Sequence, residues 1–177
     1  MHERAQFWSA VPEWSQAALR GAGIAVVPVN GASAWLLSGN FTELLARNNI
    51  GAIHGPRQLC SSETYALRLA PDRVLVVDGE ASTAALTVDP VPDCAVTEIS
   101  DGMVIFDMSG EAAAELMAQG SEYPFGDTSV LPLESASMSF GGFRVIVSRR
   151  TNGWRLHVER PWAAALWRWI EARSTDS

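Results

Sequence analysis

The sequence predicts an α+β fold, with antiparallel sheets and helices packed on their faces, built from two hairpin-helix-hairpin units. Short apolar runs come in pairs separated by turn residues, which is typical of hairpins. A helical spacing of apolar residues follows one such pair in each half of the chain. Many of these turn and cap residues recur at one constant offset in the sequence, which indicates an internal duplication within a single domain.

The duplication appears when the chain is compared with itself at an offset of 71 residues, the distance from Gly31 to Gly102. Three features then coincide without a gap: Asn30-Gly31 with Asp101-Gly102, Ser38-Gly39 with Ser109-Gly110, and Arg73-Val74-Leu75-Val76 with Arg144-Val145-Ile146-Val147. Three coincidences at one offset are much harder to obtain by chance than one. We therefore expect a single domain over residues 24–177 that contains two pseudo-repeats, about 24–78 and 95–149.

The first unit is expected to begin with a hairpin of residues 24–29 and 32–37 around Asn30-Gly31. Either Ser38 or Asn40 can cap a helix that runs to Asn48. A second hairpin, of residues 65–69 and 74–78, is expected around Pro71-Asp72.

The second unit repeats this order. Strands 95–99 and 103–108 are expected to pair, and Ser109 to cap a helix over 111–119 that Gly120 ends in a left-handed conformation. Further along the chain we expect strands 135–140 and 143–148 to pair across Gly141-Gly142, a strand at 154–159, and a closing helix at 161–173. Residues 1–23 are expected to form an N-terminal arm that includes one helix, 13–20.

The charged residues exclude several classes of function. All 13 basic residues are arginine, so there is no lysine for a phosphate-binding loop, a Schiff base or general base catalysis. A net charge of −7 argues against a nucleic-acid partner or an anionic membrane surface. No apolar run approaches the ~20 residues of a membrane span, and the first residues lack the apolar region of a secretory signal. We therefore expect a cytoplasmic protein.

The sequence shows no pattern for metal binding or nucleophilic catalysis. Cys60 and Cys94 are too few for a four-ligand zinc site, and we expect two free, half-buried thiols. His2, His54 and His157 stand far apart, and none has a second ligand at metal-binding spacing. There is no Gly-x-Ser-x-Gly motif and no carboxylate pair spaced for acid–base work. We expect no catalytic residue and no metal ligand, and the sequence names no cofactor-binding residue.

Two short motifs carry a weaker signal. Gly21-Ala22-Gly23 begins like a dinucleotide fingerprint, but the third glycine is missing and a helix is expected before the motif, so a helix C-cap is the favoured interpretation. The loop His54-Gly55-Pro56-Arg57 either lets Arg57 meet a ligand carboxylate or carries an incidental surface charge. Arg149-Arg150 is expected at a solvated hairpin tip or rim contact rather than at an anion site.

Tryptophan is unusually frequent, with seven residues, of which three fall in the closing helix. At 100° per residue, one face of that helix combines five apolar positions that we expect to pack on a sheet: Trp162, Ala165, Leu166, Trp169 and Ile170. Trp167 lies outside this stripe, so it contacts either a neighbouring loop of its own chain or another chain.

The N-terminal arm carries two more tryptophans, which need an apolar surface on this chain or on a partner. Aromatic residues are enriched at protein interfaces. Trp8, Trp14 and Trp167 are therefore the candidate partner contacts.

Three stretches resemble the gamma subunit of heterotetrameric sarcosine oxidase. They are Val96-Thr97-Glu98-Ile99-Ser100 through Phe106-Asp107-Met108-Ser109-Gly110 to Leu116 and Gly120, the ending Trp154-Arg155-Leu156-His157-Val158-Glu159-Arg160 with Ala165-Leu166-Trp167-Arg168-Trp169-Ile170, and the hairpin Ala66-Leu67-Arg68-Leu69-Ala70-Pro71-Asp72-Arg73-Val74-Leu75-Val76. The resemblance covers roughly residues 64 to 172 and includes no catalytic motif.

This resemblance implies a fold similar to the folate-binding domain of the glycine-cleavage aminomethyltransferases, which contains an internal pseudo-repeat. It implies a bacterial complex of sarcosine catabolism in which larger flavoprotein subunits bind FAD, FMN, NAD and tetrahydrofolate. The gamma-type chain would serve assembly and would bind none of these cofactors alone. No catalytic residue is carried over, because the matching motifs contain none.

Two hypotheses of different classes follow. The first is a non-catalytic subunit of a flavin- and folate-dependent amine oxidase of the sarcosine oxidase type. The alternative is a stand-alone folate-like ligand binder or one-carbon (aminomethyl) transferase, with its ligand in a cleft between the repeats. A pterin ring would require a carboxylate partner, for which Glu98, Asp107 and Glu134 are the candidates.

Overall fold

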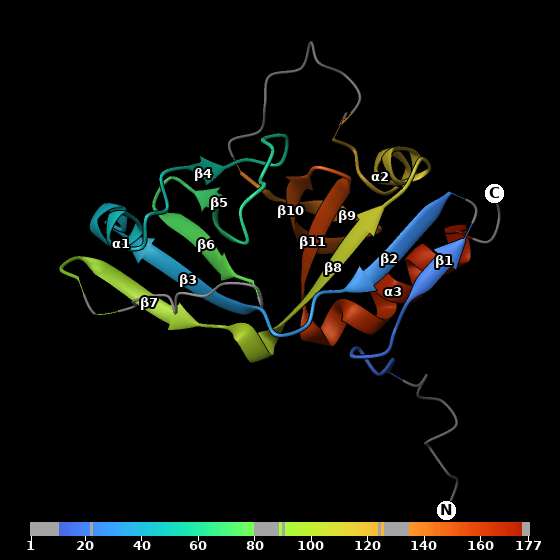
Figure 1. The fold of residues 1–177 in the computed structure, drawn as a ribbon, viewed down its shortest axis with the longest axis horizontal. Coiled ribbons are helices and arrows are strands. Elements are labelled where there is room, and N and C mark those ends of the chain that lie inside the picture. The colour runs from blue at the N-terminus through green and yellow to red at the C-terminus, as the bar shows by residue number, and fades with distance from the viewer. Residues whose placement is uncertain are drawn as a thin grey trace, which may run out of the picture.

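The computed structural model describes residues 11–21, 23–79, 89, 91–123, 125 and 135–174, which form two sheets and three α-helices (Figure 1). One sheet has six strands in the order β1-β2-β8-β11-β10-β9, and all neighbours in it are antiparallel. The other has five strands in the order β4-β5-β6-β3-β7, and only the β4–β5 pair is parallel. The predicted α+β class with antiparallel sheets is confirmed.

The elements have the following bounds. The six-stranded sheet contains β1 (Leu19–Gly21), β2 (Ile24–Pro28), β8 (Met103–Ser109), β9 (Ser137–Phe140), β10 (Phe143–Arg150) and β11 (Gly153–Glu159). The five-stranded sheet contains β3 (Ser33–Gly39), β4 (Ile53–His54), β5 (Thr64–Ala70), β6 (Arg73–Asp78) and β7 (Cys94–Glu98). The helices are α1 (Thr42–Arg47), α2 (Ala113–Gly120) and α3 (Arg160–Ser174), with a short 3₁₀ helix at Ser100–Gly102.

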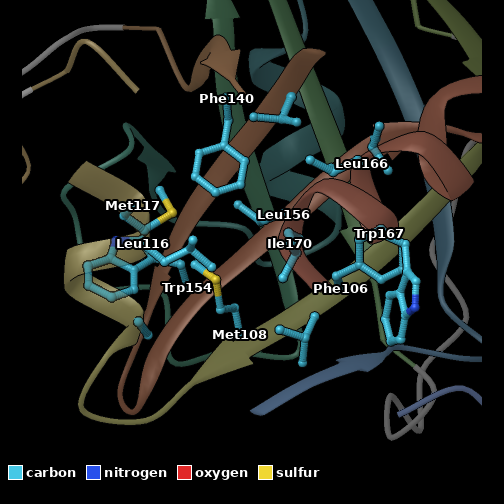
Figure 2. Packing of buried hydrophobic residues seen from close by; sticks show 14 of the residues in the cluster. Phe106, Met108, Leu116, Met117, Phe140, Trp154, Leu156, Leu166, Trp167 and Ile170 are labelled. Carbon is cyan, nitrogen blue, oxygen red and sulfur yellow. The ribbon is translucent and has the colours of Figure 1, made fainter. Parts of the chain in front are cut away.

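The elements stack in layers, with α2 and α3 on the outer face of the six-stranded sheet and α1 on the outer face of the five-stranded sheet (Figure 1). The largest apolar cluster lies between α2, α3 and the six-stranded sheet, where Phe106, Leu156, Leu166 and Ile170 are fully or almost fully buried (Figure 2). A smaller cluster around Tyr65 fills the space between the two sheets. The strands of the inner layers are therefore buried on both faces, as β11 shows over residues 153–158.

Both predicted second hairpins are confirmed. Strands β5 and β6 pair across Pro71-Asp72, and β9 and β10 pair across Gly141-Gly142, where both glycines have positive φ. These connections have two residues, so local turn chemistry decides the pairing.

Both predicted first hairpins are wrong. Strands β2 and β3 exist, but β2 pairs with β8 in the six-stranded sheet while β3 pairs with β6 and β7 in the five-stranded sheet. In the same way the chain crosses from one sheet to the other between β7 and β8. The first half of the chain thus contributes β1 and β2 to the sheet of the second half, and the second half contributes β7 to the sheet of the first. Asn30-Gly31 permits a reversal by the positive φ of Gly31, but that geometry serves a crossover as well as a hairpin.

The offset of 71 residues does not join equivalent strands throughout the two sheets. The order β7-β3-β6-β5 in one sheet corresponds to β2-β8-β11-β10 in the other, so β6 occupies the position of β11 rather than that of β10. The coincidence of Arg73–Val76 with Arg144–Val147 therefore joins strands that occupy different places in their sheets. The boundaries 24–78 and 95–149 stay a prediction.

The helix predicted over residues 13–20 is wrong. A single turn forms at its start, where the amides of Gln16 and Ala17 donate to the Glu13 carbonyl. The chain then extends into β1, which pairs with β2, so Gly21 and Gly23 belong to a β-turn region and form no helix C-cap. Pairing with β2 gives this segment backbone hydrogen bonds and buries Leu19 against the main core, which an exposed helix would not do.

The other helices lie close to their predicted positions, with differences at the ends. Asn40 Oδ1 accepts the Thr42 amide at 3.4 Å before α1, whereas α2 starts at Ala113 without a side-chain cap. Gly120 is the last residue of α2 and is not among the glycines of positive φ, so the predicted left-handed ending is wrong. A Cβ at Gly120 would lie 2.3 Å from the Phe140 ring, so close packing explains the glycine.

The buried face of α3 is also different from the predicted one. Its buried residues are Ala163, Leu166, Trp167, Ile170 and Ser174, while Trp162 is 53% exposed. Both stripes have helical spacing and apolar residues, so periodicity alone cannot choose between them. Packing decides, because Trp167 fits against Phe106 of β8, as Figure 2 shows.

Candidate functional site

The most polar part of the interior lies between the two sheets. Along β11, Trp154, Leu156 and Val158 join the cluster under the helices, so the alternate residues Arg155 and His157 face the five-stranded sheet. Both are buried, with 5% and 1% of their surface exposed. Tyr65 of β5 meets them from the opposite sheet and is 1% exposed.

These side chains form one chain of hydrogen bonds. Arg155 donates Nε and Nη2 to the two oxygens of Asp107, at 2.6 and 2.8 Å, and Nη1 to the Tyr65 hydroxyl at 3.4 Å. The Tyr65 hydroxyl lies 2.8 Å from His157 Nε2, and His157 Nδ1 lies 2.9 Å from the Ile146 carbonyl. The network joins β5 of one sheet to β8, β10 and β11 of the other.

The direction of each hydrogen bond follows from the groups involved. A carbonyl only accepts, so His157 Nδ1 carries the proton and donates to Ile146. In the neutral ring Nε2 is then an acceptor, and the Tyr65 hydroxyl donates to it while accepting from Arg155. In this state the Tyr65 hydroxyl and both nitrogens of His157 each have a matching partner, and a proton on Nε2 would face the hydroxyl proton of Tyr65 unless that hydroxyl turned away.

Burial shifts the acid–base behaviour of the network. Burial lowers the pKa of His157 to about 4, and the positive charges of Arg155 and Arg150 act in the same direction. Burial also raises the pKa of Tyr65, since no nearby group compensates fully for an enclosed phenolate. At neutral pH the pair is therefore a neutral tyrosine beside a neutral histidine.

Additional polar groups surround the network at its edge. Arg150 donates to the Ser62 carbonyl at 2.9 Å and to Glu63 at 3.1 Å, and Glu63 also lies 3.8 Å from Arg155. Cys60 is fully buried beside them as a free thiol, and burial raises its pKa, so it is a poor nucleophile. These hydrogen bonds and ion pairs connect the two sheets. Tyr65 and His157 are enclosed by them, so neither side chain is accessible to a substrate.

The predicted partner contacts have different locations. Trp8 lies outside the described residues. Trp14 and Trp167 are brought together in the chain's own core, where their rings are 5.8 Å apart and each packs against Phe106. Trp167 is 6% exposed. Their intramolecular contacts match the own-chain alternative, and a partner contact at these positions stays a prediction.

The predicted carboxylates are engaged or lie outside the described part. Arg155 holds both oxygens of Asp107. Glu98 is exposed and accepts a hydrogen bond from Ser100 Oγ at 3.1 Å. Glu134 lies outside the described residues. Within the described ranges, no three His, Cys, Asp or Glu side chains gather as a metal site, and no helix is long and apolar enough to cross a membrane.

Two clefts at the surface of the described residues are wide enough to bear on function. A groove of about 450 Å³ lies where the two crossovers meet, and its lining includes Trp14, Asn30, Asp101 and Arg160. A larger cleft of about 700 Å³ lies beside α2 and is lined by Pro56, Arg57, Ala114, Glu115, Ala118, Phe125, Arg149 and Trp154. We call this second feature the arginine cleft.

The arginine cleft brings together Arg57 and Arg149, which the sequence analysis treated as separate motifs. The guanidinium of Arg149 stacks 4.1 Å from the Trp154 ring, and that of Arg57 lies 5.2 Å from the Tyr123 ring. The bridge between Leu59 and Arg149 holds the loop of Arg57 against β10. Arg149 is therefore a wall of a concave site, whereas the sequence predicted a solvated tip or rim. No local signal joins positions 57 and 149, because a long-range strand pairing brings them together.

No protein-family model and no curated protein matches this sequence, whereas 18 chains of solved structures match its fold. A chain of the heterotetrameric sarcosine oxidase from Corynebacterium sp. U-96, solved with pyrrole 2-carboxylate, matches with a TM-score of 0.64 and 19% identity, over 87% of this chain and 85% of that one. This chain shares its fold. The predicted fold resemblance is thereby confirmed.

A second solved structure has the same fold in part of its length. The glycine cleavage system aminomethyltransferase T from Bartonella henselae matches with a TM-score of 0.54 and 14% identity. The match covers 85% of this chain but 46% of the aminomethyltransferase, so this chain corresponds to less than half of that protein.

Proposed function

We propose that the protein is a non-catalytic, gamma-type subunit of a heterotetrameric amine oxidase of the sarcosine oxidase type, acting in assembly in the cytoplasm. The main support is the structural match to a chain of a heterotetrameric sarcosine oxidase, which covers 87% of this chain and 85% of that one. Nearly equal coverage means that the two chains have about the same length. The resemblance therefore extends over a whole small chain and does not end at one domain of a large enzyme.

The interior supports a structural role. The Tyr65–His157 pair is the kind of group that could transfer a proton, but both side chains are 1% exposed and their hydrogen bonds are satisfied within the protein. In this proposal FAD, FMN, NAD and tetrahydrofolate are bound by the larger flavoprotein subunits.

One surface has the composition of a subunit contact. Trp162 is 53% exposed and lies over Phe143, and the neighbouring Trp169 is half-buried with the Arg173 guanidinium 4.1 Å from its ring. We call Trp162, Phe143 and Trp169 the aromatic flank of α3. Tryptophan and arginine are enriched among residues that dominate binding energy. The helix carries three arginines and one glutamate, so it is basic in an acidic chain and complements an acidic partner surface.

Co-expression with flavoprotein subunits of the sarcosine oxidase type from the same organism tests the proposal. We expect a stable complex that oxidises sarcosine, and no sarcosine oxidation by the isolated chain. Trp162→Ala should weaken assembly at least tenfold, whereas Leu59→Ala, which removes a side chain of similar exposure (55%) outside the aromatic flank, should leave it unchanged. A chain that stays monomeric beside these subunits, or that turns over sarcosine alone, would contradict the proposal.

A second candidate is a folate-like ligand binder, favoured by the groove at the crossovers and by the aminomethyltransferase fold. In this case folate should quench tryptophan fluorescence saturably at micromolar concentration, and Trp14→Phe should reduce the quenching because Trp14 lines that groove. Absence of saturable quenching would remove this candidate.

A further inference from the structure

The arginine cleft has the size and lining of a small-molecule site. Its volume of about 700 Å³ lies within the range of pockets that enclose drug-sized ligands. One wall is the apolar side of α2 at Ala114 and Ala118, and aromatic rings of Phe125 and Trp154 form another part of the lining. These two rings pack edge to face with centroids 6.0 Å apart, so their positions are fixed by contact.

Arg149 brings to this cleft a positive charge that pairs with no carboxylate among the described residues. Its guanidinium stacks on Trp154, and among the described residues no carboxylate or carbonyl accepts a hydrogen bond from it. The adjacent Arg150 is paired with Glu63. Arg155 of β11 is paired with Asp107. In a chain with 20 acidic and 13 basic residues, an arginine at the wall of a cleft with no anionic partner in the described ranges is unusual.

The geometry around Arg149 favours a planar anion. Stacking on an indole ring holds the guanidinium plane while leaving its edge free to form two parallel hydrogen bonds. A carboxylate fits that edge in bidentate geometry. Arg57 adds a second positive charge to the same lining, and Glu115 is the acidic residue that lines it. Glu115 accepts a hydrogen bond from Gln119 on the α2 surface.

We propose that the arginine cleft binds a small aromatic carboxylate, with the carboxylate on Arg149 and the ring against Phe125, Trp154 and the alanines of α2. The lining supports this class, since the cleft offers apolar and aromatic walls for a ring together with guanidinium donors for one anionic group. This inference goes beyond the proposed function, and it concerns the isolated chain whether or not the chain is a subunit.

Calorimetric titration of the full chain with indole-3-acetate tests the inference. We expect saturable binding of one equivalent, at least tenfold weaker binding of the neutral analogue indole-3-acetamide, and no binding of acetate at the same concentration. Inorganic phosphate as a competitor should displace indole-3-acetate poorly, because it lacks the ring.

Three variants locate the site. Arg149→Gln should weaken indole-3-acetate binding at least tenfold, while Arg144→Gln, which removes an exposed arginine from the same strand, should not change it. Ala118→Trp should block binding by filling the cleft without removing a charge, and Ala118 is exposed, so the fold tolerates the larger side chain. An unchanged thermal midpoint establishes that each variant is folded.

Several results would overturn the inference. They are equal affinity for the acid and the amide, full binding by Arg149→Gln or Ala118→Trp, and no binding of indole-3-acetate by the wild-type chain. If the wild-type chain does not bind indole-3-acetate, and Arg149→Gln and Ala118→Trp both lose complex assembly, the cleft binds a protein partner instead. The assembly experiment with Trp162→Ala fails or succeeds independently of these titrations.

Discussion

Acid should destabilise this protein through His157. The imidazole is 1% exposed, donates to Ile146 and accepts from Tyr65, so the folded state requires the neutral ring. Burial lowers the pKa of the folded-state ring to about 4 from an ordinary value of 6.5. The unfolded chain therefore binds a proton between pH 6.5 and 4 that the folded chain does not, and stability is lost as the pH falls through this window.

The magnitude follows from the two pKa values. Each unit of difference is worth 1.36 kcal/mol, so His157 alone removes about 3 kcal/mol of unfolding free energy once the pH reaches about 4. About 2 kcal/mol of this is already lost between pH 7 and pH 5, since the unfolded ring is then almost fully protonated. That is a large share of the 5–15 kcal/mol that typically separates folded from unfolded domains.

Urea unfolding at a series of pH values from 7 to 5 measures this loss, with His157→Gln as the matched variant. An amide, like the neutral ring, has a donor group and an acceptor group but does not titrate. The variant should be less stable at pH 7, and its stability should depend less on pH by about 2 kcal/mol over this range. Parallel pH profiles for the two proteins would refute the argument that His157 is held neutral.

Three further substitutions test the packing and the polar network. Asp107→Asn should cost about 3–5 kcal/mol of stability, because it removes the carboxylate that Arg155 holds with two hydrogen bonds and leaves the buried charge with the more distant Glu63 at 3.8 Å; urea unfolding at pH 7 measures the cost, and a change below about 1 kcal/mol would contradict it. Ser148→Ala should keep or raise the thermal midpoint, because the Ser148 hydroxyl is buried with no hydrogen-bond partner among the described residues; a lower midpoint would reveal a missing partner. Gly120→Ala should destabilise by about 1–3 kcal/mol through its contact with Phe140, although alanine is the better helix former; a stabilised variant would show that this contact is loose.

Sequence patterns predicted the elements better than their pairing. Two-residue turns fixed the hairpins at Pro71-Asp72 and Gly141-Gly142, since strands joined so closely have few alternatives. The crossover at Asn30-Gly31 has the same turn chemistry, but its strands belong to different sheets. Only the tertiary arrangement, in which β2 completes the sheet of β8, distinguishes these cases, and no local pattern reports it.

The polar network was beyond sequence reasoning for a related reason. Tyr65 and His157 are 92 positions apart, and neither has a partner at a recognisable spacing. A signal did exist in β11, where two polar residues, Arg155 and His157, alternate with three large apolar ones. That alternation predicts one polar face of a strand, but only the second sheet covering this face makes it a buried layer.

Trp162 was missed because two apolar stripes on α3 satisfy the same periodicity. Helical spacing placed Trp162 on the stripe expected to be buried, whereas packing against Phe106 places Trp167 in the core and leaves Trp162 exposed. The surface most suited to a partner thus came from the structure.

We propose that this chain docks, as a non-catalytic component, onto larger flavoprotein subunits. Native mass spectrometry of the protein co-expressed with flavoprotein subunits of the sarcosine oxidase type from the same organism tests this most directly. We expect one copy of this chain in a four-chain assembly, with all flavin mass on the other subunits. Flavoprotein subunits that assemble fully without this chain, or flavin bound to this chain itself, would contradict it.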